Sequence, residues 1–178
     1  MTNSTVLKDS LAEAIVSDEI QLGGDGVKSI LSAYLPQESI AEYIWNGFDA
    51  GATSIDISYE ENELGSLNNI TIADNGSGIP QGLLSVKFKP FHESEKALNK
   101  TDSRHHSLVH GKNGVGRLTF FTFANIARWT TVYKKSSKLY KYDIEIKSND
   151  LHSYTGAHSP VSEVPYEQGT STKVTFEG

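Results

Sequence analysis

Residues 36–50 read PQESIAEYIWNGFDA and residues 69–79 read NITIADNGSGI, and the fold prediction starts from these two stretches. In the first, Pro36 suits the opening turn of a helix and Gly51 stands just past its end, so a helix is predicted over the whole stretch. In the second, apolar and polar residues alternate up to Asp74, which predicts a strand followed by a turn. A helix and a strand in this order begin an α/β pattern.

The remaining periodicity extends this pattern along the chain. Residues 1–34 form an N-terminal segment that reads helical, and a second helical run is expected from Gly114, with Leu118, Phe121 and Ala124 at helical spacing. Further strands are expected near Ile55–Tyr59, Arg128–Lys135, Lys138–Lys147 and Thr172–Glu177. The sum predicts an α/β domain of the two-layer α+β type, with a mixed, largely antiparallel sheet and helices on one face.

Composition limits the class of protein. With 178 residues, 19.5 kDa and no internal linker, the chain is predicted to form a single domain, 1–178. A net charge of −6 does not indicate nucleic-acid binding by this domain. The sequence has no cysteine and no apolar run near the ~20 residues that a membrane helix needs, so a cytoplasmic domain without membrane contact is expected.

The predicted helix over residues 36–50 has two distinct faces. At 100° per residue an apolar arc of about 140° forms the expected core face, made of Ile40, Ile44, Phe48, Ala41 and Trp45. Glu42, Asn46 and Asp49 gather on an adjoining polar face, because they are spaced by four and three residues. This face is either an ordinary solvated surface or a functional one, with a carboxylate for general-base work and an amide oxygen for a cation such as Mg²⁺.

Asp74 and the residues after it form a second candidate site. Asp74-Asn75-Gly76-Ser77-Gly78-Ile79 is a common kind of turn sequence, so a plain loop is one interpretation. The functional interpretation is that Gly76 and Gly78 allow a flat ligand to approach closely, while the carboxylate accepts a hydrogen bond from its exocyclic amine.

A glycine-rich loop opens the predicted helical run after residue 110. Free backbone N–H groups at such a helix start are suited to phosphate oxygens. The loop consists of Gly111, Lys112, Asn113, Gly114, Val115, Gly116 and Arg117. A fourth feature, Gly169-Thr170 before the last strand, is uninformative by itself.

Taken together and in order, these features resemble the GHKL ATPases, which include type II topoisomerase B subunits, ninety-kilodalton heat-shock chaperones, histidine kinases and MutL. The residues from Glu42 to Ala50 are similar to the family's N box, and Asp74 to Gly78 and Gly111 to Arg117 are similar to its two glycine boxes. Gly169-Thr170 is similar to its last box. The resemblance covers about residues 35–176 and is closest to MutL-like and chaperone-like members.

The resemblance implies a Bergerat fold that binds ATP and Mg²⁺ and hydrolyses ATP to ADP and phosphate. Glu42 would activate the attacking water, Asn46 would hold the metal, and Asp74 would bind the adenine amino group. The other nucleotide contacts implied are Asp49, Gly76, Gly78, Ile79, Lys96, Gly111, Lys112, Asn113, Gly114, Val115, Gly116, Arg117 and Thr170. Residues 88–117 would form a mobile lid whose closure drives homodimerisation or engages a downstream effector region of a longer protein.

Three other interpretations remain open. One is a conformational switch that binds ATP without hydrolysing it, and another is phosphotransfer as in histidine kinases, which the base at Glu42 disfavours. The third is an interaction domain that binds no nucleotide. Histidines at 92, 105, 106 and 110 invite a zinc hypothesis, but without cysteine and a clear acidic partner the polarity of a lid is the simpler account.

Overall fold

The structure is a computed structural model that describes residues 28–29, 31–88 and 116–178. Residues 89–115 of the predicted lid, 88–117, and most of the predicted helical segment, 1–34, lie outside these residues, so the lid and the helical segment remain predictions. Within the described ranges no helix is long and apolar enough to cross a membrane.

Two α-helices, six strands and short 3₁₀ helices make up the described fold, with all strand pairs antiparallel. The α-helices are α2 (Pro36–Asp49) and α3 (Leu84–Phe88), and the longest 3₁₀ helix is η2 (Gly116–Thr122). The strands are β1 (Ile55–Glu61), β2 (Leu67–Asp74), β3 (Ile126–Lys135), β4 (Lys138–Lys147), β5 (Ser162–Val164) and β6 (Ser171–Glu177).

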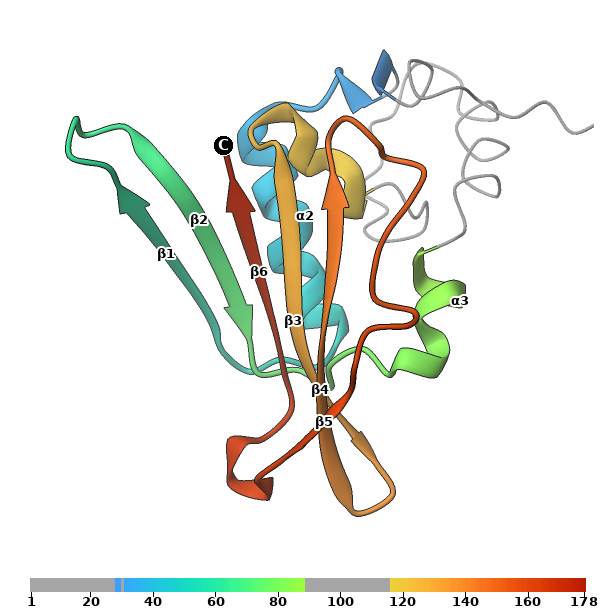
Figure 1. The fold of residues 1–178 in the computed structure, drawn as a ribbon. Coiled ribbons are helices and arrows are strands. Elements are labelled where there is room, and N and C mark those ends of the chain that lie inside the picture. Colours follow the sequence, from blue (N-terminus) through green and yellow to red (C-terminus); the bar gives the residue numbers. More distant parts are fainter. Residues whose placement is uncertain (1–27, 30, 89–115) are drawn as a thin grey trace, which may run out of the picture.

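The strands form one sheet in the order β1-β2-β6-β3-β4-β5. The last long strand, β6, therefore lies in the middle, between β2 and β3, and Figure 1 shows α2 running behind this centre. This arrangement brings the end of β2, where Asp74 stands, beside the start of β6. The predicted two-layer α/β class is confirmed, whereas the expected mixed character of the sheet is not found among the described strands.

One face of the sheet carries the core. On this face, the register of the strands aligns apolar residues of neighbouring strands in rows. One such row consists of Ile72, Val174, Trp129 and Ile144. All four are nearly inaccessible to solvent. On the other face, polar side chains pair with one another; Arg128, for instance, bonds to Glu145 and Glu177. In the part of the chain that the structure describes, α2 therefore covers the apolar face.

The predicted core face of α2 is wrong at Trp45 and Phe48, although Ile40 is half-buried and packs against the core as predicted. Trp45 and Phe48 are 45% and 49% exposed and pack on each other, while the buried residues of the helix are Ser39, Tyr43 and Gly47. The ring of Tyr43 packs between strands against Phe176, at 4.6 Å between centroids. Gly47, one turn after Tyr43, lets the helix approach β1 and β2 closely, whereas Ser39, one turn before it, bonds to Thr122 of η2. A prediction from hydrophobicity alone detects neither requirement.

Two further elements differ from expectation. The helical run expected from Gly114 is the short 3₁₀ helix η2, which buries Leu118, Thr119 and Phe120 and ends before Ala124. Strand β5 was not predicted, because its three residues are too few for an alternating pattern to register. The hairpin between β3 and β4 agrees with the prediction.

Candidate functional site

Gly47 brings α2 into direct contact with Asp74. A Cβ at Gly47 would lie 2.9 Å from Cδ1 of Ile55 and 3.1 Å from Cβ of Asp74. Such distances leave no room for a side chain, so the glycine costs some helix propensity but lets helix and strand touch. The end of β2 is thereby fixed against the second half of α2.

The turn after Asp74 packs on the end of the same helix. A Cβ at Gly76 would meet both the Cβ and the carbonyl oxygen of Ala50 at 2.9 Å. The next residue, Ser77, donates its N–H to that same carbonyl oxygen at 2.9 Å. The last carbonyl groups of a helix have no N–H donor within the helix. The turn thus supplies a donor to one carbonyl group at the carboxyl end of α2.

Gly78 holds the turn against the sheet. Its φ is +71°, and a Cβ there would lie 2.1 Å from the carbonyl oxygen of Val132 in β3. Both the backbone angle and the available space therefore require glycine. The sequence singled out Gly76 and Gly78 as residues that let a ligand approach closely. In the structure, both glycines are needed first because other segments of the chain pack directly against them.

Replacing Gly78 by alanine is expected to destabilise the fold more than the same change at Gly65. Gly65 has a similar φ of +74°, but no atom of the described residues lies within 4 Å of the methyl group that alanine would add, so its replacement isolates the backbone strain, about 1–2 kcal/mol. Overpacking against Val132 should add about 1–3 kcal/mol at Gly78. Urea unfolding of both variants measures the difference, and equal losses of stability would contradict the close packing of the turn.

Asp74 is a half-buried carboxylate at the end of a strand. Its Oδ1 accepts a hydrogen bond from the N–H of Gly76 at 2.8 Å. Burial raises the pKa of Asp74 above its ordinary value, although the backbone N–H groups of Gly76 and Thr172 act in the opposite direction. A carboxylate has about four acceptor positions, so these two donors leave capacity for another donor.

Glu42 lies at the other end of the site, against the start of η2. A Cβ at Gly116 would be 2.8 Å from Oε2 of Glu42, so the backbone of Gly116 runs directly beside the carboxylate. The next residue of α2, Tyr43, donates its hydroxyl to the carbonyl oxygen of Arg117 at 2.7 Å. One turn earlier, Ser39 and Thr122 share a hydrogen bond of 3.0 Å. Three consecutive contacts therefore join α2 to η2.

Arg117 connects η2 to the end of α3. Its guanidinium donates to the carbonyl oxygen of Phe88 at 2.7 Å and lies over the ring of the same residue. Burial lowers the pKa of Arg117 to about 10, with the nearby phenols of Tyr43 and Tyr154 opposing the shift. The side chain thus acts as a cross-link between the two described segments that flank residues 89–115.

The structure places the remaining predicted residues less closely together. Asn46 and Asp49 are exposed on α2, and Thr170 lies just before β6. Ile79 is half-buried and directly follows residues 75–78, which we call the glycine turn. The residue of β6 that pairs with Asp74 is Thr172, two positions further on. The other predicted nucleotide contacts, Lys96, Gly111, Lys112, Asn113, Gly114 and Val115, lie outside the described residues.

Three residues that hold this site were not singled out as site residues in the sequence. Gly47 sets the approach of α2, and Thr131 and Tyr142 bond to the backbone of Ile79. The sequence does contain a signal for Gly47: a glycine inside a predicted helix lowers the stability of the helix, so its presence suggests a packing or functional reason. No local pattern connects Thr131 or Tyr142 to a turn more than 50 residues earlier in the chain.

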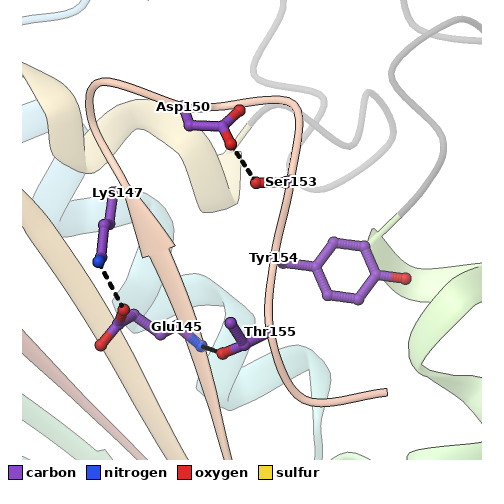
Figure 2. A pocket seen from close by; sticks show the side chains of 6 residues that line it. All are labelled: Glu145, Lys147, Asp150, Ser153, Tyr154 and Thr155. Carbon is purple, nitrogen blue, oxygen red and sulfur yellow. Dashed lines mark hydrogen bonds and ion pairs between the residues drawn. The ribbon is translucent and has the colours of Figure 1, made fainter. Parts of the chain in front are cut away.

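A hollow of about 200 Å³ lies at the end of β4. Figure 2 shows its lining, which comes from β4 and the loop that follows: Glu145, Lys147, Asp150, Ser153, Tyr154 and Thr155. Glu145 and Lys147 alternate with buried Ile144 and Ile146, so they belong to the open polar face of the sheet. Their ion pair spans 3.6 Å, and Ser153 bonds to Asp150. No group of metal-ligating side chains is found in the described ranges.

Comparison with known proteins shows the family of this chain. The profile of the family described as "Histidine kinase-, DNA gyrase B-, and HSP90-like ATPase" matches residues 34–172. The DNA mismatch repair protein MutL of Listeria innocua is 35% identical over 138 residues, which are 72% of this chain and 21% of that protein. MutL of Neisseria meningitidis serogroup C is 28% identical over 126 residues, 71% of this chain and 18% of that protein.

The chain thus spans about a fifth of the length of the curated relatives that it matches. The matched family region begins just before α2 and ends within β6, so it includes Glu42, Asp74 and the glycine turn. The chain therefore belongs to the family of histidine kinase-, DNA gyrase B- and HSP90-like ATPases.

Proposed function

We propose that this chain is the ATP-binding domain of a Mg²⁺-dependent ATPase that hydrolyses ATP to ADP and phosphate. One observation carries the proposal: α2 contacts both ends of the candidate site. Gly47 touches Asp74 at one end, and Glu42 lies beside Gly116 at the other. Glu42 and Gly47 are five residues apart, which corresponds to about 7.5 Å along the helix axis. The helix thus sets the distance between a carboxylate suited to base recognition and one suited to water activation.

The chemistry of the side chains fits ATP. Asp74 has unused acceptor capacity for the adenine amino group, with Gly76, Gly78 and Ile79 forming the adjoining wall. The amide oxygen of Asn46 is a hard ligand of the kind that Mg²⁺ binds together with phosphate oxygens. Bound Mg²⁺ would neutralise phosphate charge. The backbone of residues 111–117 would donate to phosphate oxygens, with Lys96 and Thr170 as further contacts.

Glu42 is proposed as the general base. Its carboxylate is half-buried and directed at the start of η2, the point where the phosphate-binding loop continues into described residues. There it would accept a proton from the attacking water, a role that typically contributes about 10²–10⁴-fold to a rate. Asp49, exposed at the end of α2, is proposed as a supporting nucleotide contact rather than a catalyst.

The remaining parts of the proposal concern partners and organisation. Residues 1–178 are taken as one nucleotide-binding domain in which residues 88–117 close over ATP, with dimerisation or engagement of further protein as the consequence. Support for this comes from membership of the family and from longer relatives, of which this chain covers about a fifth. Sedimentation with and without a non-hydrolysable ATP analogue would measure the nucleotide dependence of dimerisation.

Calorimetric titration with a non-hydrolysable ATP analogue tests the proposed function. The chain is expected to bind one equivalent saturably in the presence of Mg²⁺ and more weakly after Mg²⁺ is removed with EDTA, because the phosphate charge then lacks its counter-ion. Inorganic pyrophosphate serves as a control for binding by charge alone. Absence of any binding by a folded chain would refute the proposal.

A further inference from the structure

A pair of buried side chains holds both backbone polar groups of Ile79. Thr131 of β3 and Tyr142 of β4 face each other directly in the sheet and are both buried. The N–H of Ile79 donates to Oγ1 of Thr131 at 2.9 Å, and the hydroxyl of Tyr142 donates to the carbonyl oxygen of Ile79 at 2.9 Å. The end of the glycine turn is therefore clamped from two neighbouring strands.

This clamp continues across the sheet to Asp74. The hydroxyl of Thr131 lies 3.2 Å from the carbonyl oxygen of Ser171, its acceptor in β6, and 3.4 Å from Oγ1 of Thr172. Thr172 is in turn the register partner of Asp74. Asp74, Thr172, Thr131 and Tyr142 thus form one row of polar side chains across four strands.

The row is exceptional on this face of the sheet. The next row is wholly apolar, with Ile72, Val174, Trp129 and Ile144, and the row after it contains Ile70, Phe176, Ala127 and Ile146. Apolar residues would cover the turn without the cost of burying hydroxyls. In the described residues every buried polar side-chain atom has a partner, so the row is a completed network.

We propose that Thr131 and Tyr142 are positioning residues that set the selectivity of this site for adenine. The inference rests on the proposed function. With Ile79 clamped and Gly78 pressed on Val132, the turn stays at a fixed depth beside Asp74. A base held there presents its exocyclic group to the carboxylate: adenine offers an amine donor, whereas guanine offers a carbonyl oxygen that the carboxylate repels.

Loss of the clamp lets the turn move away from the sheet. The base can then shift relative to Asp74, so the contact that distinguishes a donor from an acceptor weakens. Affinity for ATP should therefore fall, and the preference for ATP over GTP should fall with it. A purely structural role of Thr131 would reduce the folded fraction but would leave that preference unchanged.

The test compares Thr131→Val, which keeps the shape and removes the hydroxyl, with Thr131→Ser, which keeps the hydroxyl. Non-hydrolysable analogues of ATP and GTP are titrated by calorimetry at a temperature where circular dichroism shows each variant folded. Thr131→Val should raise the Kd for the ATP analogue roughly tenfold, because it leaves the N–H of Ile79 unpaired, and should lower the ATP-over-GTP ratio of affinities by a similar factor. Thr131→Ser should restore both values.

Two further variants complete the design. Tyr142→Phe removes the second half of the clamp and should shift the ratio in the same direction. Thr175→Val is the matched control, because Thr175 shares a hydroxyl pair of 3.2 Å with Thr71 and lies on the open face, away from the turn. It should leave affinity and ratio unchanged.

The outcomes separate this inference from the proposed function. Wild-type chain that binds neither analogue would refute the proposed function and the inference with it. Wild-type binding combined with an unchanged ratio in Thr131→Val, or with no rescue by Thr131→Ser, would overturn the clamp alone.

Discussion

Replacing Glu42 by glutamine is expected to lower the steady-state rate of ATP hydrolysis by about 10²–10⁴-fold, the usual contribution of a positioned general base. Glutamine keeps the size of the side chain and its contact with Gly116, so the packing of α2 against η2 should remain. An amide cannot take the proton of the attacking water. Nucleotide affinity should therefore change little while turnover is lost.

Release of phosphate by the full-length protein measures this effect, beside calorimetry of the ATP analogue on the same variant. Glu38→Gln is the matched control: Glu38 lies one turn earlier on α2 and accepts the N–H of Leu35 at 2.9 Å, which a glutamine oxygen also accepts. Unchanged turnover in Glu42→Gln would contradict the assigned base. Tight binding without any hydrolysis by the wild type would instead favour the ATP-dependent switch.

Asp74→Asn is expected to give the largest loss of nucleotide affinity. A hydrogen bond to a charged group is worth about 1.5–3 kcal/mol, and each 1.4 kcal/mol corresponds to about tenfold in Kd. Affinity for the ATP analogue should thus fall by about one to two orders of magnitude. The asparagine oxygen can still accept the N–H of Gly76, so the turn should keep its place.

The same substitution should not destabilise the fold at neutral pH. Burial raises the pKa of Asp74 in the folded chain above the ordinary value of 3.8, so the folded state holds this proton more tightly than the unfolded state does. The contribution of Asp74 to stability is therefore fully present below about pH 4 and is lost as the pH rises through the raised pKa. Asparagine, which never ionises, avoids that loss, and Asp74→Asn should match or exceed the wild type at pH 7.

Urea unfolding at pH 7 and below pH 4, together with analogue titration at pH 7, tests both halves of the prediction. Asp56→Asn is the control, because Asp56 is exposed on β1 and its register places it on the open face of the sheet. That variant should leave affinity unchanged. Full affinity in Asp74→Asn would show that the carboxylate does not recognise the base, and a large loss of stability at pH 7 would contradict its assigned environment.

Local sequence was enough for most of the secondary structure. The proline at the start of α2 and the glycine after it mark both ends of the helix, and alternating residues identify five of the six strands to within about three residues. These signals are local because backbone conformation and period are set by neighbouring residues. The resemblance to the ATPase family also rested on short local segments, and the match of the family profile confirms that family.

The inner face of α2 is a case where local reasoning was not sufficient. Hydrophobicity favoured Trp45 and Phe48 as core residues, yet the structure buries Ser39 and Gly47. The reason is distance: α2 lies so close to β1 and β2 that a Cβ at Gly47 would overlap Ile55. Only the three-dimensional packing shows that small size, and not apolar character, is the property required at Gly47.

By itself, the sequence determined the approximate bounds of α2 and of five of the six strands, the α/β class and the ordered residues that place the chain in its ATPase family. The tertiary structure alone decided how Asp74 is held. Ala50, Thr131, Tyr142 and Thr172 reach the segment from Asp74 to Ile79 from separate elements, across up to about 100 residues of chain. Contacts of this kind depend on sheet order and register, and no periodic pattern within one segment encodes them.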